Sequence, residues 1–209
     1  MRASVPFFSL AALAFAATIG AAPVPLTAER LTPVNRTVTV DSSGVVQLDT
    51  AKGDGIAWLR DAQLAEGRIS VEVRGLDKPG ASFVGVAFHG KDDREYDAVY
   101  LRPFNFNAAD PVRRAHAVQY VSHPAHTWSK LREQFPGKYE AGLDPAPAAG
   151  EWVRLTLEIR GREVRVFVAD GTTPALTVQL LNERGTGRVG LWVGNDSAGW
   201  FRGAALRER

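Results

Sequence analysis

The sequence predicts an all-β domain built as a two-sheet antiparallel β-sandwich. Apolar and polar residues alternate with period two from Arg68 to Arg74 and again from Trp152 to Arg160, which indicates strands with one buried and one exposed face. About a dozen short segments of strand character are separated by Gly, Pro and Asp-Gly turns, as is typical of sandwiches. A closed barrel is the competing architecture. The long loop from Ser122 to Gly150 and the uneven strand spacing count against it.

A signal peptide is expected over residues 1–22. Arg2 precedes an apolar run from Phe7 to Ile19, and Gly20-Ala21-Ala22 then supplies small residues that suit signal peptidase. The apolar run is too short for a comfortable membrane span, and an uncut N-terminal anchor is the alternative. We therefore expect a secreted or periplasmic protein with no membrane span after cleavage.

Residues 23–35 are expected to form a linker, because Pro23, Pro25 and Pro33 disfavour regular structure. Residues 36–209 are then expected to form a single domain, which is long enough to bury a sizeable core. Removal of the signal peptide leaves 24 Lys and Arg against 23 Asp and Glu. This balance gives no electrostatic reason to expect nucleic acid as a partner. The chain has no cysteine, so neither disulfides nor thiol chemistry are expected.

The elements follow in order from the linker onwards. Thr37 to Val40 and Val45 to Leu48 are expected to pair as a hairpin around Ser43-Gly44. Thr127 to Gln134 is expected to form a short helix inside a long loop. The other expected strands are Gly55 to Leu59, Arg68 to Arg74, Ser82 to His89, Glu95 to Arg102, Arg114 to Val121, Trp152 to Arg160, Val164 to Val168, Ala175 to Leu180, Gly187 to Gly194 and Gly199 to Leu206.

The stretch from Ser82 to Glu140 is the candidate site, because it contains all four histidines and all four tyrosines of the chain. Gly85 and Ala87 are small and would leave room above the sheet, so their face is a candidate groove floor. A sugar ring packs its C–H groups on an aromatic side chain, and its hydroxyls need planar or bidentate polar partners. This combination of residue types favours a carbohydrate ligand.

The candidate binding residues are Tyr100, Arg102, Asn105, Gln119, Tyr120, Trp128 and Arg132. Tyr100 and Trp128 are expected to stack on the sugar. Hydroxyls would be held by Arg102, Asn105 and Gln119. His89, His116 and His123 are the candidate catalytic residues, as proton carriers, if the ligand is also turned over. The alternative is that the strand tyrosines are ordinary half-buried β-formers.

Several segments together resemble the concanavalin A-like lectin/glucanase superfamily. They are GASFVGVAFHG, YDAVYLRPFN and HAVQYVSHP, followed by WVRLTLEIRG and GRVGLWVG. The resemblance covers roughly Val38 to Leu206. Within this superfamily the chain is similar in particular to laminin-G-like modules and to secreted 3-keto-disaccharide hydrolases. It implies a jelly roll with a concave, saccharide-binding face. A carbohydrate-binding protein, a glycoside hydrolase or lyase, and a laminin-G-like protein-interaction module all stay open, so whether the chain is an enzyme is not decided.

The catalytic motif of the laminarinase-type glucanases is incomplete in this chain. Their Glu-x-Asp-x-x-Glu pattern is matched by Glu95 and Asp97, but Tyr100 stands where the last Glu belongs. Retaining hydrolysis needs a second carboxyl group about 5–5.5 Å from the first, which Glu133 or Glu140 would have to supply from a loop. The Asn-Ser-Gly segment of the 3-keto-disaccharide hydrolases is also missing.

No cofactor motif is present, and calcium is the metal that stays possible. Calcium binds oxygen ligands on loops, and the candidates here are Asp92, Asp93, Asn105, Asn107 and Asp110. Their spacing matches no recognised calcium motif. His116, His123 and His126 could be interpreted as a zinc set, but strand and loop histidines need not converge.

Overall fold

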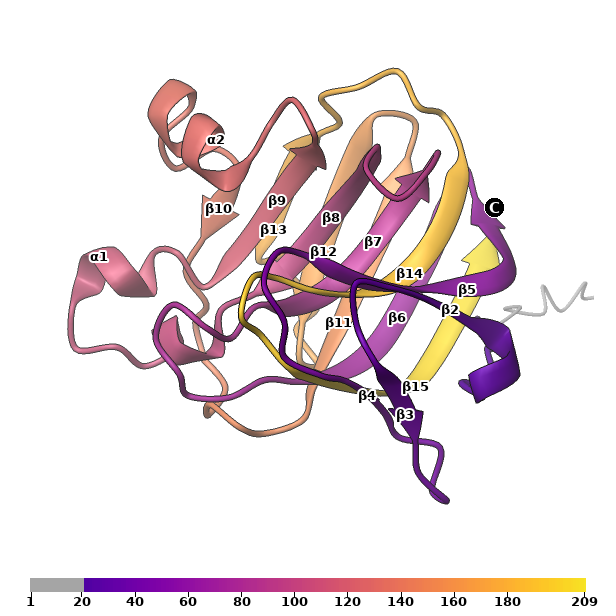
Figure 1. Cartoon of the computed structure of the whole chain (residues 1–209). Coiled ribbons are helices and arrows are strands. Elements are labelled where there is room, and N and C mark those ends of the chain that lie inside the picture. The colour runs from indigo at the N-terminus through magenta and orange to yellow at the C-terminus, as the bar shows by residue number, and fades with distance from the viewer. Residues whose placement is uncertain (1–20) are drawn as a thin grey trace, which may run out of the picture.

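The computed structural model describes residues 21–209, which form two antiparallel sheets packed face to face (Figure 1). The predicted all-β sandwich is confirmed. The expected signal peptide lies outside the described residues except for Ala21 and Ala22, and Ala22 pairs with Leu206. Within residues 21–209, none of the helices has the length and apolar character that a membrane crossing requires.

One sheet, here called the back sheet, has eight strands. In spatial order they are β13 (Leu176–Gln179), β12 (Glu163–Val168), β11 (Val153–Arg160), β6 (Gly67–Arg74), β15 (Gly199–Glu208), β4 (Val46–Leu48) and β3 (Val38–Val40), with β1 (Ala22–Pro23) also paired to β15. The front sheet has seven strands. They are β10 (Glu140–Ala141), β9 (Val118–His123), β8 (Tyr96–Leu101), β7 (Val84–Gly90), β14 (Gly187–Val193), β5 (Gly55–Leu64) and β2 (Leu31–Val34).

Within residues 21–209, the helices are all short. They are η1 (Ala28–Arg30), η2 (Pro103–Asn105), α1 (Pro111–Arg114) and α2 (Trp128–Gln134). The expected helix at Thr127 to Gln134 is confirmed as α2, which lies in the connection between β9 and β10. In Figure 1, α1 and α2 lie on the side of the molecule where β9 and β10 form the edge of the front sheet.

The core lies between the sheets and follows the predicted alternation. Ile69, Val71 and Val73 of β6 are all buried, and they lie on the face that meets the front sheet. Val86 and Leu191 of the front sheet are buried and face Ile69 and Val71 across the space between the sheets. The period-two pattern therefore identified the buried face of these strands correctly.

Two boundaries differ from the prediction. The expected linker contains an edge strand, because Leu31–Val34 pairs with β5, and Pro33 is tolerated there because an edge strand needs no donor on its open side. The expected strand from Arg114 starts only at Val118. Asp110 caps a helical turn before it by accepting a hydrogen bond from the Val112 amide, with Pro111 in the first helical position.

Candidate functional site

Aromatic rings fill the middle of the outer face of the front sheet. Trp58, Tyr96, Tyr100 and Trp192 are each only 2–3% exposed. The rings of Tyr100 and Trp192 stack at 4.8 Å. The space above Gly85 is taken by its neighbour, since a Cβ there would lie 2.7 Å from the Tyr100 Cβ. The expected groove floor at Gly85 and Ala87 is therefore covered, and Tyr100 has no free ring face to offer a ligand.

An open groove lies instead at the edge of this sheet. Its volume is about 440 Å³, and η2, α1 and α2 contribute half of its lining residues. The lining residues are Gly80, Phe83, Arg102, Phe104, Asn105, Arg113, His116, Trp128, Arg132 and Asn195. The structure thus brings five predicted site residues together in one place: Arg102, Asn105, His116, Trp128 and Arg132.

The helix α2 supplies the aromatic wall of the groove. Leu131 is buried and anchors the helix, so that Trp128 and Arg132, one turn apart, project from the same helical face. The guanidinium carbon of Arg132 lies 5.1 Å from the centre of the Trp128 ring, within the range of a cation–π contact. Trp128 is nevertheless 49% exposed, so much of its ring faces solvent beside the groove.

A buried carboxylate lies beneath the groove. Glu140 of β10 is only 4% exposed and binds Arg132 in a bidentate pair, at 3.0 Å to Nε and 2.7 Å to the terminal nitrogen. The same carboxylate lies 2.9 Å from Nδ1 of His116 and 3.7 Å from Arg102. Three cationic or titratable groups therefore share one negative charge, which fixes their positions.

Arg102 ties the groove to the sheet. It is buried and donates to the hydroxyl of Tyr100 at 3.0 Å and to Oε1 of Gln119 at 3.1 Å. A third bond runs to the backbone carbonyl of His116 at 3.1 Å. Gln119 is fully engaged below the groove, because its amide nitrogen donates to two backbone carbonyls. Tyr100 and Gln119 thus support Arg102 and do not line the groove.

The helical turns η2 and α1 place the remaining polar groups. The side-chain nitrogen of Asn105 donates to the His116 carbonyl at 3.1 Å, and its oxygen accepts from Nε of Arg113 at 3.3 Å. Arg113 also donates to the Phe104 carbonyl at 3.0 Å. The ring of Phe104 packs edge-on against Phe83 at 5.5 Å. The groove is consequently preorganised on three of its sides.

Burial shifts the protonation equilibria in and under the groove. Desolvation lowers the pKa of His116, although Glu140 beside it acts in the opposite direction. Burial also lowers the pKa of Arg102, which an arginine tolerates while staying charged at neutral pH. The pKa of Tyr100 is raised to about 12, again mainly by burial. At neutral pH the groove therefore presents guanidinium groups and a neutral imidazole.

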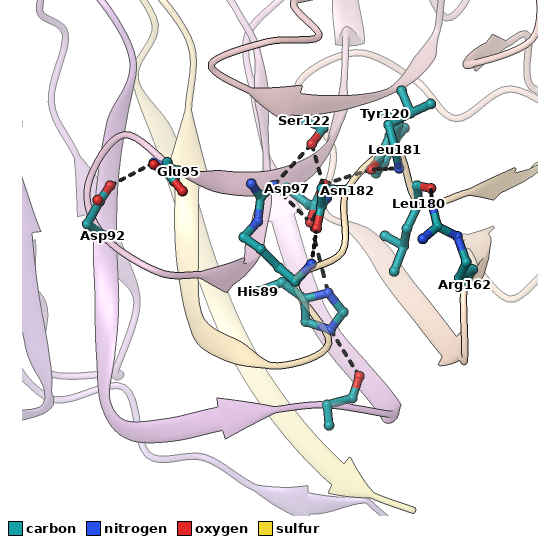
Figure 2. A network of polar contacts seen from close by, with 12 residues as sticks. His89, Asp92, Glu95, Asp97, Tyr120, Ser122, Arg162, Leu180, Leu181 and Asn182 are labelled. Carbon is teal, nitrogen blue, oxygen red and sulfur yellow. Dashed lines mark hydrogen bonds and ion pairs between the residues drawn. The ribbon is translucent and has the colours of Figure 1, made fainter.

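Two predicted site residues, His89 and Tyr120, lie elsewhere, on the face of the front sheet that meets the back sheet. Both reach the buried carboxylate of Asp97 (Figure 2): the Tyr120 hydroxyl donates to it at 2.7 Å, and Nδ1 of His89 lies 3.9 Å from it. Asn182 and Arg184, from the loop between β13 and β14, also bind Asp97. These residues form a tie between the sheets, away from the groove.

His89 is on the inner face because the strand alternation breaks there. Its φ is +48°, and the pairing of β7 with β14 shifts register between Arg188 and Gly190. A bulge of this kind reverses the side to which the following side chain points. The ring then bonds through Nε2 to the Ala65 carbonyl at 2.9 Å.

His123 belongs to a third cluster. Its Nε2 lies 3.5 Å from Asp54, its ring stacks on Tyr96 at 4.9 Å, and the Tyr96 hydroxyl donates to Asp54 at 3.1 Å. His123 pairs with Tyr96 in the β8–β9 ladder, whereas Gln119 pairs with Tyr100. His116 and His123 are thus at opposite ends of this strand pair.

The side chains considered for calcium each make contacts with other parts of the chain or cap their own turn. Asp92 caps its own turn, Asp93 accepts from Nε1 of Trp58, and Asp110 caps α1. Asn107 donates to the Pro147 carbonyl at 2.9 Å. Across residues 21–209, no cluster of three or more His, Cys, Asp or Glu side chains has the arrangement of a metal site.

A second hollow, of about 560 Å³, lies on the outer face of the back sheet. Its arginines are paired with glutamates: Arg68 with Glu158 at 3.5 Å, and Arg154 with Glu72 at 3.6 Å. Compensated, solvent-exposed charge of this kind is ordinary for a sheet surface. We therefore use the outer face of the back sheet as the comparison for the charge of the groove.

The residues that the sequence analysis left out of the site are mainly Glu140, Arg113 and Phe83. Glu140 was only one of two loop glutamates that could supply a carboxylate. Its strand, β10, has two residues, too few for any alternation to indicate which side the residue faces. Arg113 is in a one-turn helix that has no sequence periodicity of its own.

No protein-family model matches the sequence, and a search of curated proteins finds no relative. Solved structures match at low identity. The carbohydrate-binding module CBM66 from Bacillus subtilis is 14% identical with a TM-score of 0.63, covering 85% of this chain and 95% of that module. The exoplasmic/lumenal domain of VIP36, solved with Ca²⁺ and Man3GlcNAc, is 10% identical with a TM-score of 0.58, covering 87% and 86% of the two chains.

A third match is a protein of Parabacteroides distasonis described as a candidate glycosyl hydrolase. It is 12% identical with a TM-score of 0.55, and the match covers 90% of this chain and 99% of that one. At these identities the likeness is one of fold. The matches confirm the predicted resemblance to the concanavalin A-like lectin/glucanase superfamily at that level.

Proposed function

We propose that this chain is an exported carbohydrate-binding protein whose ligand binds in the groove between η2, α1 and α2. The observation that carries the proposal is the half-exposed ring of Trp128, held beside the groove by Arg132. A rigid aromatic face next to fixed hydrogen-bond donors suits a sugar ring, which has apolar C–H groups on its faces and hydroxyls around its edge.

The fold matches support the same ligand class. CBM66 is named as a carbohydrate-binding module, and the VIP36 domain was solved with a bound oligosaccharide. The proposed export rests on the expected signal peptide, residues 1–22. Fractionation and sequencing of the N-terminus test it: cleavage after Ala22 supports export, and a protein that keeps Met1 and stays in the cytoplasmic fraction counts against it.

Binding is tested by calorimetry against a panel of neutral and acidic oligosaccharides. We expect Trp128→Ala to weaken binding by about fivefold or more, since loss of a central aromatic contact commonly costs more than about 1 kcal/mol. Trp200→Ala is the matched control, because Trp200 is on the back sheet and packs against Arg74 at 5.0 Å. Equal affinity in the wild type and Trp128→Ala, or no binding to any saccharide, would contradict the proposal.

A second candidate function is hydrolysis or elimination of a glycoside. The close approach of His116 Nδ1 to Glu140, 2.9 Å, favours it, because a neutral imidazole beside a carboxylate can accept a proton. Against it, Arg132 holds both oxygens of Glu140. Product analysis in the same panel distinguishes the two: a product lost in His116→Gln would make the chain an enzyme.

The laminin-G-like interaction module has the least support. A protein-binding surface of that kind would expose a contiguous apolar patch of several hundred Å². Among the described residues, the exposed large hydrophobic side chains are Leu76, Val112, Trp128 and Phe135. Leu76 and Val112 come from separate segments, and Trp128 and Phe135 lie at opposite ends of α2.

A further inference from the structure

The groove has more positive charge than its own carboxylate can balance. Arg102 and Arg132 share Glu140, whereas the hydrogen bonds of Arg113 within residues 21–209 go to the neutral groups of Asn105 and Phe104. Three guanidinium groups therefore face one carboxylate, which leaves an excess of two positive charges at neutral pH. Among the described lining residues there is no Asp or Glu.

The groove also has donors in excess of acceptors. Arg132 uses Nε and one terminal nitrogen on Glu140, and Arg113 uses the same pair of positions on Asn105 and Phe104. Within residues 21–209, no hydrogen bond engages the other terminal nitrogen of either side chain. Both guanidinium groups are thus fixed in place with N–H groups to spare, and a guanidinium cannot accept.

The acceptors in the groove are mostly engaged. The side-chain oxygen of Asn105 accepts from Arg113, and that of Asn195 accepts from the Gly53 amide at 2.7 Å. A neutral sugar presents hydroxyls, each of which both donates and accepts, so the O–H groups of its hydroxyls would find few free acceptors in this groove. A carboxylate accepts only, and its planar geometry matches a guanidinium fork.

We propose that the groove selects an acidic saccharide, with the carboxylate of a uronic-acid unit held between Arg113 and Arg132 and the sugar ring packed on Trp128. This inference rests on the proposed function, because it names the ligand class of the same site. The back sheet provides the contrast: there Arg165 is paired with Glu163 at 2.7 Å, so its charge is already compensated.

The test compares oligouronides with their methyl esters, which keep the sugar rings and hydroxyls and add one methyl group in place of the charge. Galacturonate, glucuronate and mannuronate trisaccharides and their esters are titrated into the mature protein at an ionic strength of about 20 mM, where charge interactions are weakly screened. We expect at least one acid to bind about tenfold or more tightly than its ester. That preference should shrink at about 500 mM salt.

Variants locate the preference. Arg113→Gln should reduce the ratio of acid to ester affinity several-fold, Arg113→Lys should retain most of it, and Arg165→Gln on the back sheet should leave it unchanged. Circular dichroism confirms that each variant is folded. An acid preference that survives Arg113→Gln would place the carboxylate elsewhere and overturn the inference.

The other outcomes separate the two proposals. If acids and esters bind equally, or only neutral sugars of the wider panel bind, the inference fails while the carbohydrate-binding proposal stands. If no saccharide binds at all, both fail.

Discussion

Replacement of Glu140 by Gln removes the negative charge under the groove and keeps the shape of the side chain. The partner most affected is Arg102, which is 4% exposed and lies 3.7 Å from the carboxylate. Arg132 is closer, at 2.7 Å, but its side chain is 35% exposed, so water can solvate its charge when the ion pair with Glu140 is lost. The expected damage therefore comes mainly from an unbalanced charge on buried Arg102.

The magnitude follows from these two environments. Removal of one partner of a buried ion pair costs about 3–5 kcal/mol, and an exposed pair contributes about 0–1 kcal/mol. Arg102 keeps its hydrogen bonds to Tyr100, Gln119 and the His116 carbonyl, so the lower end, about 3 kcal/mol, applies. For a domain of this size about 1 kcal/mol corresponds to 2–4 °C, which predicts a Tm lower by about 6–12 °C.

Thermal and urea unfolding followed by circular dichroism measure this change. Glu158→Gln is the matched control, because the pair of Glu158 with Arg68 is 3.5 Å long and partly exposed on both sides. Its Tm should change by less than about 3 °C. Equal Tm values for Glu140→Gln and the wild type would refute the conclusion that Glu140 balances the buried charge of Arg102.

Three further predictions concern the rest of the fold. In urea titrations, Asp97→Ala should lower the free energy of unfolding by about 3–5 kcal/mol, because it leaves Arg184 and the Tyr120 hydroxyl without their buried partner. Tyr120→Phe should lower it by about 1–2 kcal/mol in the same assay. Stability should fall as pH drops from about 7.5 to about 5, because burial lowers the pKa of His89, His116 and His123 in the folded state. Trp128→Ala should lower the free energy of unfolding by no more than about 1 kcal/mol, because about half of the ring is exposed and a cation–π contact at an exposed site contributes about 0.5–1 kcal/mol.

The sign of the pH effect follows from proton binding. Between the lowered pKa of the folded state and the ordinary value near 6.5, the unfolded chain binds more protons, so stability is complete above that window and is lost as pH falls through it. His89→Gln should remove part of this loss. A Tm that rises on acidification would contradict the predicted loss of stability at low pH.

For the tie between the sheets, an Asp97→Ala variant as stable as the wild type would be the contrary result.

The fold could be predicted because strand alternation is a local signal. Val153, Leu155, Leu157 and Ile159 are all buried, as their spacing requires. The same rule misplaced His89, because one residue with φ of +48° reverses the side to which the chain points. Composition gives no warning of that reversal.

The site could be predicted only in part, for a related reason. The aromatic and arginine content of the central stretch predicted residue types that line the groove, and α2 brings Trp128 and Arg132 together as a one-turn spacing allows. Tyr100 was expected to stack on sugar, but the Trp192 ring occupies its face. Such an exclusion depends on a residue 92 positions away in the chain, which no local pattern encodes.

The most direct test of saccharide binding in the groove is an NMR titration of the tryptophan indole N–H signals. The chain has five tryptophans, and Trp128→Phe assigns the signal of Trp128. Titration with the saccharide of the panel that binds most tightly should shift the Trp128 signal, while the back-sheet signals of Trp152 and Trp200 stay in place. Shifts confined to Trp152 and Trp200, or no shift at Trp128 at saturation, would contradict binding in the groove.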